Sequence, residues 1–256
     1  MEKLFVVKVG GAVLEDEKTL DDFLQRFADL KENKILIHGG GRSATQLSTR
    51  LGIETKMVDG RRITDEDTIT IITMVYGGLI NKKTVAILQS KGCNALGLTG
   101  ADMNLITAIK RPVKEIDYGF VGDVVKVDNN AITLLINSGI VPVISPLTHD
   151  NKGQLLNTNA DTMASSIATA MVNQFDVSLV YCFEKAGVLS DPDNELSVIY
   201  ELNKNDYQQY LASGTIHSGM IPKLDNSFNA LVLGVKNVII TNTNSLNTKN
   251  GTHLSL

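Results

Sequence analysis

Near its N-terminus the chain reads Leu4-Phe5-Val6-Val7-Lys8-Val9-Gly10-Gly11, and the same arrangement returns in Ile35-Leu36-Ile37-His38-Gly39-Gly40-Gly41. Each stretch is a short apolar run that ends in consecutive glycines, which is typical of a buried strand followed by a strand-to-helix turn. Glycine lets the backbone approach a ligand closely, so successive N–H groups can converge on an anion. The two turns together indicate an α/β protein with a phosphate site.

Two lysines strengthen this interpretation. Lys8 stands at the end of the first apolar run, where a charge is unfavourable unless an anion meets it. Lys223, in Ser218-Gly219-Met220-Ile221-Pro222-Lys223, lies at a predicted helix start, where the helix dipole disfavours a cation unless an anion is present. Taken alone, Lys223 is typical of a solvated surface residue. The pair makes phosphate chemistry the leading hypothesis.

Segments rich in Val, Ile and Leu alternate with helical stretches, which predicts βαβ units around a largely parallel, buried sheet. The predicted strands are Leu4–Lys8, Ile35–His38, Ala95–Leu98, Ile140–Ile144, Val177–Cys182 and Asn237–Thr241. Residues 106–127 predict an antiparallel excursion around the turn Asp117-Tyr118-Gly119, which could act as a flap. We expect one compact unit with a soft boundary near residues 170–180, because 256 residues, 43% of them hydrophobic, provide an ample core.

The longest predicted helix begins after Thr64 as N-cap and ends near Lys91-Gly92. Its predicted apolar stripe is Ile69, Ile72, Val75 and Leu79. Gly77-Gly78 in its middle weakens a helix, so we expect close packing there against another backbone or subunit. Further helices are predicted at Asp128–Ser138, Ala160–Asn173, Asn203–Ser213 and Met220–Leu233.

Composition excludes several classes of protein. With 24 Lys and Arg against 28 Asp and Glu, and no basic stretch, nothing favours a nucleic-acid partner. We expect no membrane association, since no signal peptide precedes the first strand and no apolar run reaches bilayer-spanning length. Cys93 and Cys182 have no metal or redox spacing, which favours buried thiols in a reducing cytoplasm and predicts no metal site built from protein side chains.

Two known nucleotide-binding motifs also contain glycine turns after a strand. The P-loop pattern fails because the chain contains no Gly-Lys pair. A dinucleotide fingerprint is present in Gly39-Gly40-Gly41-Arg42-Ser43-Ala44, with Asp59 downstream. That alternative stays open, although it leaves the first glycine turn and everything after residue 150 unexplained.

A polar segment follows, in which Asn157, Asn159 and Asp161 occupy alternate positions before a predicted helix. In an extended stretch, alternate side chains share one face. The simpler interpretation is a loop in which Asn159 or Asp161 caps the helix. Among the four histidines only His38 lies near a glycine turn, and we expect it to be structural, closing the turn by a hydrogen bond.

In order along the chain, these motifs resemble those of the amino acid kinases, and specifically the N-acetylglutamate kinases. The resemblance rests on Lys8-Val9-Gly10-Gly11, His38-Gly39-Gly40-Gly41, Gly60-Arg61-Arg62, Gly119-Phe120-Val121-Gly122, the Asn157 to Asp161 segment and Gly219-Met220-Ile221-Pro222-Lys223, and it runs from about residue 4 to Gly251-Thr252. It implies an open, mainly parallel sheet sandwiched between helices in a single kinase domain. The implied N-lobe, about residues 1–173, binds an acylated amino acid, and the C-lobe, about 174–256, binds ATP.

The resemblance also assigns roles. Lys8 and Lys223 would flank the transferring phosphoryl group, and Asp161 would orient both ammonium groups. Backbone N–H groups of Gly10, Gly11, Gly40 and Gly41 would face the phosphates and the accepting carboxylate. Arg62 with Asn157 would hold the α-carboxylate of the substrate, Asn159 would support the site, and Mg²⁺ would accompany ATP.

One segment departs from the family pattern, because Cys182-Phe183-Glu184 stands where relatives have a Ser/Thr-Asp pair. Glu184 would take the place of that aspartate, and Gly187 would lie in the same nucleotide region. The resemblance predicts a cytoplasmic homodimer, without the extra N-terminal helix of the arginine-inhibited hexamers. Alternatives left open are N-succinylglutamate as acceptor, with Arg61, Lys110 or Arg111 as its cation, a sibling kinase with another acceptor, and a non-catalytic amino-acid sensor.

Overall fold

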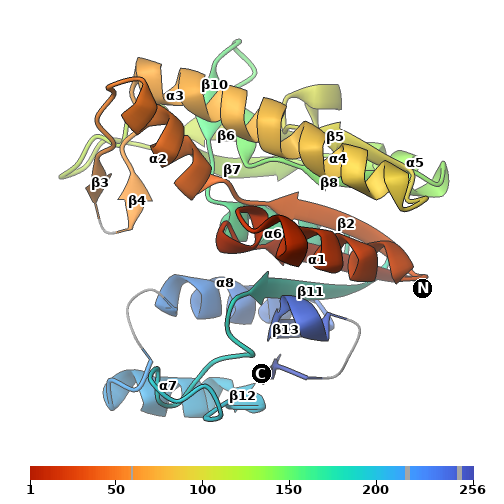
Figure 1. Cartoon of the computed structure of the whole chain (residues 1–256). Helices are drawn as coiled ribbons and strands as arrows, with labels where there is room; N and C mark the ends of the chain where they lie inside the picture. The colour runs from red at the N-terminus through yellow and green to blue at the C-terminus, as the bar shows by residue number, and fades with distance from the viewer. Residues whose placement is uncertain (59, 217–219, 247–249) are drawn as a thin grey trace.

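The computed structural model describes residues 1–58, 60–216, 220–246 and 250–256. Eight strands form one mixed, mostly parallel sheet in the order β12-β14-β13-β11-β1-β2-β8-β5 (Figure 1). Their bounds are β1 Lys3–Val9, β2 Asn33–His38, β5 Ala95–Leu98, β8 Val141–Ile144, β11 Asp176–Phe183, β12 Glu201–Asn203, β13 Asn237–Asn242 and β14 Thr252–Ser255. All six predicted strands are therefore confirmed.

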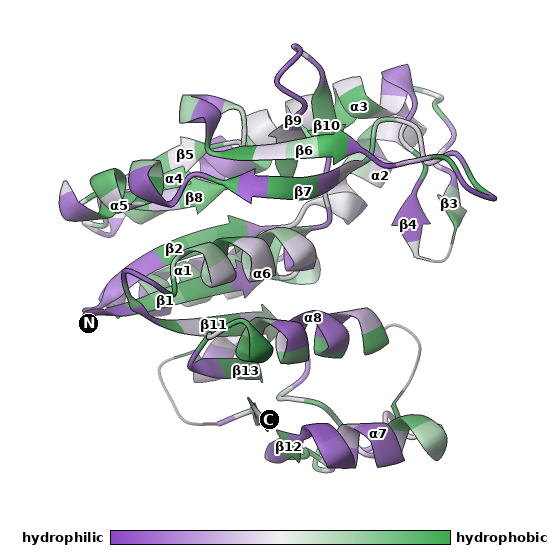
Figure 2. Ribbon diagram, turned by 180° about the vertical axis from the view of Figure 1, so that it is seen from behind, coloured by the Kyte–Doolittle hydropathy of each residue, from purple (hydrophilic) through white to green (hydrophobic). Residues whose placement is uncertain are grey.

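Helices cover both faces of this sheet, so the αβα sandwich is confirmed. One face packs against α5 (Asn129–Asn137), α6 (Ala160–Ala170) and α8 (Ile221–Val232), with α7 (Lys204–Ala212) beyond them. The other face packs against α1 (Glu17–Asp29) and α4 (Asn81–Ser90). Figure 2 shows the central strands as largely hydrophobic ribbons between these layers. Because side chains alternate along a strand, Lys8 lies on the same face of β1 as Leu4 and Val6, which is the α6 face.

A second, four-stranded sheet lies beside the main one, in the order β10-β9-β6-β7. Its strands are β6 Ile106–Lys110, β7 Gly122–Val127, β9 Leu147–His149 and β10 Leu155–Asn157. The predicted antiparallel excursion is confirmed in the β6–β7 pair, and β9 and β10 extend it. A short hairpin, β3 Met57–Val58 with β4 Arg61–Arg62, follows helix α2 (Gly41–Arg50).

The long helical run was predicted with two errors. It begins at Glu66 with Asp65 as N-cap, because the backbone of Thr64 is paired instead with Tyr118 and Phe120 in an extended segment. Its middle is a π-helix, η2 (Thr73–Ile80), between α3 (Glu66–Ile72) and α4. The wider π turn changes the register of the apolar stripe. Leu79 is consequently 64% exposed, whereas Tyr76 and Ile80 are buried.

The expectation that no apolar run reaches bilayer-spanning length was also wrong. The helical run Glu66–Ser90 is long and apolar enough by length and composition, and 44% of its most apolar window is buried. A core helix of a soluble protein meets the same criterion, and here the run packs onto Ala44 and Leu147.

The other predicted helices form with small shifts, except that α6 ends at Ala170 rather than Asn173. In the described part of the chain, three short 3-10 turns complete the elements: η1 Ala12–Leu14, η3 Asp102–Asn104 and η4 Thr243–Ser245. Both cysteines are buried and free, as expected.

Candidate active site

The two glycine turns meet at the carboxyl edge of the main sheet, because β1 and β2 are parallel neighbours and end side by side. The N–H of Gly10 donates to the carbonyl of Cys182 on β11 at 2.8 Å, which ties the first turn to the next strand. A Cβ on Gly39 would lie 3.4 Å from the nitrogen of Gly11, so the two turns are in contact. Their shared edge is the centre of the candidate site.

A cavity of about 480 Å³ opens at this edge. It is bounded by both glycine turns, by the end of β11 and by the start of α8, and the lining side chains with charge are Lys8, Arg42, Glu184 and Lys223. We call it the phosphate cavity. It brings together Lys8, Gly10, Gly11, Gly40, Gly41, Glu184 and Lys223, which the sequence had placed in one site.

One carboxylate bridges the two lysines. The Nζ of Lys8 lies 2.6 Å from Oδ1 of Asp161, and the Nζ of Lys223 lies 3.2 Å from Oδ2 of the same side chain. Burial, the largest influence, acts to raise the pKa of Asp161, but the two ammonium groups together hold it below its ordinary value. Asp161 is thus ionised, and the cluster carries one net positive charge in a partly dry cavity, which is suited to binding an anion.

The N-terminus of α6 fixes Asp161 in place. Asn159 is the N-cap, and its Oδ1 accepts hydrogen bonds from the N–H groups of Asp161 at 2.9 Å and Thr162 at 3.0 Å. The buried hydroxyl of Tyr181 donates to the carbonyl of Asp161 at 3.2 Å. The capping interpretation of Asn159 is therefore confirmed, and this cap is what orients Asp161.

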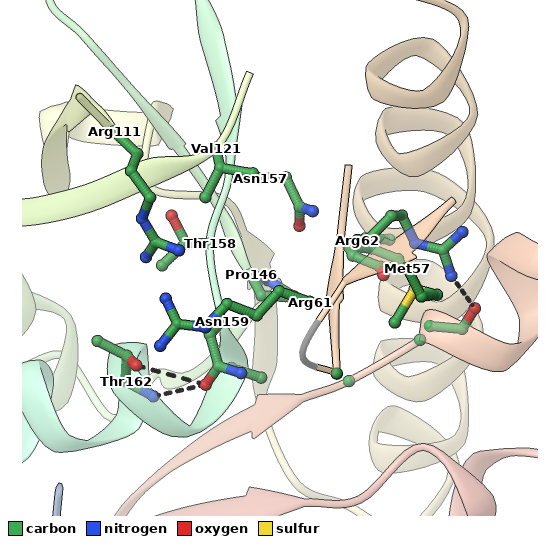
Figure 3. Close-up of a pocket in the computed structure, with 16 residues that line it drawn as sticks. Met57, Arg61, Arg62, Arg111, Val121, Pro146, Asn157, Thr158, Asn159 and Thr162 are labelled. Atoms are coloured by element: carbon green, nitrogen blue, oxygen red, sulfur yellow. Dashed lines mark hydrogen bonds between the residues drawn. The ribbon is translucent and has the colours of Figure 1, made fainter. Parts of the chain in front are cut away.

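A second cavity, of about 240 Å³, adjoins the Gly39-Gly40-Gly41 turn, and Lys8 is not among its lining residues (Figure 3). We call it the acceptor cavity. Besides that turn, its polar lining consists of Arg61, Arg62, Arg111, Asn157, Thr158, Asn159 and Thr162. Among the residues that the structure describes, three arginines and no carboxylate line it, so it is suited to a small anionic molecule.

These arginines differ in their partners. Arg62 is buried, and its guanidinium donates to the carbonyl of Gly41 at 2.8 Å, to Thr45 Oγ1 at 2.7 Å and to Thr55 Oγ1 at 3.2 Å. Arg111 is paired with Asp123 at 2.6 Å. Arg61 has no hydrogen bond or ion pair with any residue that the structure describes, and Figure 3 shows its side chain extending toward Asn159.

A third cavity, of about 230 Å³ and mostly apolar, adjoins the phosphate cavity and shares Met220 with it. Val188, Leu189, Pro192 and Ile216 supply its apolar wall. Gly187 lies in that wall, where a Cβ would come within 2.7 Å of Thr252 Oγ1 and 2.9 Å of Val198 Cγ1. We call it the apolar cavity. The phosphate cavity thus shares lining residues with both of the others, namely Gly39, Gly40 and Gly41 with the acceptor cavity and Met220 with the apolar cavity.

Some residues of this site were not predicted. Arg42, in the first turn of α2, lies 3.6 Å from Glu15 and 3.8 Å from Glu184, and it lines the phosphate cavity. The signal used for Lys223, a cation at a helix start, would have found it. Tyr76 lines the acceptor cavity without any sequence signal, because it reads as part of an apolar helix stripe. Of the predicted motifs, Ser218, Gly219 and Asp59 lie outside the described residues.

The model of the amino acid kinase family matches residues 3–242. The chain belongs to this family. As an amino acid kinase it is 56% identical to the acetylglutamate kinase of Bacteroides fragilis over 253 residues, which cover 99% of this chain and 97% of that protein. It is 57% identical to the acetylglutamate kinase of Cytophaga hutchinsonii over 247 residues, covering 96% and 94% of the two chains.

Among solved structures, the N-acetylglutamate synthase from Neisseria gonorrhoeae complexed with coenzyme A and N-acetyl-glutamate has a TM-score of 0.83 at 22% identity. The match covers 100% of this kinase and 59% of that chain, and at this identity it shows the fold alone. The dinucleotide alternative is excluded, since the glycine turn that suggested it lies inside the matched kinase region.

Proposed function

We propose that this kinase transfers the γ-phosphoryl group of ATP to the γ-carboxylate of an N-acylglutamate, with N-acetyl-L-glutamate as the acceptor, in arginine synthesis. The observation that carries the proposal is the Lys8–Asp161–Lys223 cluster between the acceptor cavity and the apolar cavity. The near full-length relatives called acetylglutamate kinase support the choice of acceptor.

ATP fits the apolar and phosphate cavities together. The adenine occupies the apolar cavity beside Gly187 and Val188, and the phosphates extend past Met220 toward the lysines. The N–H group of Gly11 faces the phosphates, whereas that of Gly10, which the resemblance had placed there too, is bonded to the Cys182 carbonyl instead. Glu184 lies at the rim of the phosphate cavity. Among the described residues there is no cluster of three side chains that could hold a metal ion, and Asp161 is already paired. Mg²⁺ would enter bound to the ATP phosphates, whose oxygens are ligands that it prefers.

N-Acetylglutamate fits the acceptor cavity. Its α-carboxylate is held by Arg62, which also bonds the Gly41 carbonyl, and by Asn157, which lines the same cavity. Its γ-carboxylate points toward the N–H groups of Gly40 and Gly41, at the boundary with the phosphate cavity. Asn159 supports both by holding the start of α6.

The reaction needs no general base, because a side-chain carboxyl with a reference pKa near 4.3 is ionised at neutral pH. One oxygen of the γ-carboxylate forms a bond to the γ-phosphorus of ATP. The bond from that phosphorus to the oxygen bridging to the β-phosphate breaks, and ADP leaves with the electron pair. Lys8 and Lys223 neutralise the charge that builds on the transferring group, and Asp161 keeps both ammonium groups aimed at it.

A trapping assay tests this proposal. The purified protein is incubated with MgATP, hydroxylamine and one acceptor at a time, chosen from N-acetylglutamate, N-succinylglutamate, glutamate, aspartate and carbamate. Hydroxamate formation with an N-acylglutamate alone supports the proposal. Product from another acceptor assigns a sibling kinase, and binding of an N-acylglutamate without any ADP release assigns a sensor.

A second acceptor, N-succinylglutamate, is favoured by one observation. A succinyl group adds a carboxylate that needs a cation, and Arg61 lines the acceptor cavity without a partner among the described residues. Arg111 is already neutralised by Asp123, and the Nζ of Lys110 lies over the ring of Phe120 at 5.0 Å. A ratio of kcat/KM for the two acceptors decides between them.

We also propose a cytoplasmic homodimer that meets through the long helical run. Met74 and Leu79 are exposed large apolar residues on η2, and nothing lies within 4 Å of a Cβ built on Gly78. A symmetric contact through this face would bury both side chains and bring two backbones close together. Light scattering is expected to give the mass of two chains, and a Leu79→Lys variant is expected to be monomeric.

A further inference from the structure

We infer that the long helical run positions the acceptor-side glycine turn through a buried relay, Asn81 to His38 to Gly39, and that Asn81 and His38 are positioning residues for phosphoryl transfer. The inference rests on the proposed function, in which Gly40 and Gly41 face the accepting carboxylate. Neither side chain lines any of the three cavities described above. They can act on the reaction only by holding the turn.

Hydrogen bonds define the state of the imidazole. The Nδ1 of His38 lies 2.8 Å from the carbonyl oxygen of Gly39, which can only accept, so Nδ1 carries the proton. The Nε2 lies 3.1 Å from Nδ2 of Asn81, which donates to it and also to the carbonyl of Val143 at 2.9 Å. Lys82 donates to Oδ1 of Asn81 at 3.1 Å, which fixes the orientation of the amide.

The imidazole is therefore neutral and locked in one tautomer. It has no solvent exposure, and burial lowers its pKa to about 4, against the smaller opposing effect of the Gly39 hydrogen bond. Lys82 is the charged group close enough to act on it, and it lowers the pKa further. A neutral, fully buried imidazole with this single acceptor holds the Gly39 carbonyl in one orientation, and we call this hydrogen bond the Gly39 latch.

That latch sets the direction of the next N–H group. In a trans peptide the C=O of one residue and the N–H of the following residue point in opposite directions. Holding the Gly39 carbonyl toward His38 thus aims the N–H of Gly40 away from the imidazole. The Gly40 nitrogen lies next to the first glycine turn, 4.0 Å from a Cβ built on Gly11. This N–H makes no hydrogen bond to another backbone group in the described part of the chain, so it is free for a ligand.

The π-helix supplies a second contact on the same turn. A Cβ on Gly40 would lie 2.7 Å from Ile80 Cδ1 and 2.7 Å from Tyr76 Cδ1, so the turn is pressed against η2. Tyr76 and Ile80 belong to η2, and Asn81 is the first residue of α4. The wider π turn places these side chains toward one glycine turn, which gives this irregular segment a function.

Two substitutions at His38 separate positioning from simple structural support. His38→Asn keeps an amide donor near the Nδ1 position and so keeps the Gly39 latch, whereas His38→Leu removes it. Both lose the imidazole, so we expect similar losses of thermal stability. For the acceptor, we expect kcat/KM to fall by about tenfold or more in His38→Leu and by about threefold or less in His38→Asn, with KM for ATP nearly unchanged in both.

Asn81→Ser provides a milder check, and it should lower acceptor kcat/KM without changing KM for ATP. Equal acceptor kinetics in the two folded His38 variants would overturn the inference. Nitrogen NMR of the wild-type imidazole needs no variant to fold: Nδ1–H with unprotonated Nε2, unchanged from about pH 5.5 to 8, is expected, and the other tautomer overturns the relay. If wild type phosphorylates no acceptor, the proposed function fails while this NMR result still tests the geometry.

Discussion

Removing the charge of Lys8 is expected to lower turnover by about a hundredfold or more, which corresponds to about 2.7 kcal/mol of lost transition-state stabilisation. The side chain of Lys8 is only 11% exposed and that of Lys223 is 26% exposed, so solvent screens the first charge less. Two unit charges about 4 Å apart interact by about 4 kcal/mol at an effective dielectric constant near 20. The expected loss is therefore within what one ammonium group can supply.

The assay is steady-state ADP release by Lys8→Ala, Lys223→Ala and Lys8→Arg, with both substrates varied. We expect kcat to fall in both alanine variants, more in Lys8→Ala, with KM changed by about threefold or less, because the charge matters most where negative charge develops. Arginine should not restore full activity, since its planar fork cannot replace a compact ammonium.

Lys83→Ala is the matched control, because Lys83 pairs with Glu17 on the surface and lines none of the three cavities. It should leave both kinetic constants unchanged. Unchanged turnover in folded Lys8→Ala protein would refute the mechanism. A loss seen only in KM would show that Lys8 binds ATP without acting on the transferring group.

Four further outcomes are expected. Asn159→Ala removes the N-cap of α6 and should lower the free energy of unfolding by about 1 kcal/mol, measured by denaturant unfolding. It should also lower kcat, because the cap no longer fixes the first turn of α6, which carries Asp161. The folded state lowers the pKa of Asp161, so the stability that its ionised form contributes is complete above the unfolded pKa near 3.8 and is lost as pH falls through the folded pKa. Asp161→Asn should therefore flatten the acid side of a plot of Tm against pH. An unchanged slope contradicts this expectation. Gly40→Ala should weaken binding of the acceptor and so raise the KM for the acceptor, since the added methyl group would lie 2.7 Å from Ile80 and from Tyr76 on the long helical run. Arg61→Gln should leave kcat/KM for N-acetylglutamate within about twofold, and a selective loss with N-succinylglutamate would make the succinyl compound the acceptor.

The strands could be predicted from the sequence because buried parallel strands appear as nearly continuous apolar runs. The glycine turns and Lys8 were found for the same reason, since each breaks such a run at its carboxyl end. Asp161 was found through its spacing from Asn157 and Asn159. That spacing, however, did not distinguish a ligand from a helix cap, and Asn159 proved to be the cap.

What could not be predicted depends on register and on distance in space. The π turn shifts side chains by a fraction of a turn, so Leu79 was assigned to the buried stripe while Tyr76 was missed. The sequence predicts Thr64 as the N-cap because its β-type pairing with residues 118–120 leaves no local signal. The contact of Asn81 with His38 joins residues 43 positions apart, which periodicity alone cannot reveal.

The pairing of β1 with β11 has a consequence for how this molecule could have evolved. Seven consecutive residue pairs, from Lys3 with Asp176 to Val9 with Cys182, join the strand that carries Lys8 to the strand that leads to Glu184. These paired strands join the portions that we assign to the acceptor and to ATP, so neither portion can be exchanged as an independent domain. Recombination between relatives must preserve the register in which β1 pairs with β11. New acceptor preferences are therefore reached more easily by changing side chains around the acceptor cavity than by exchanging halves.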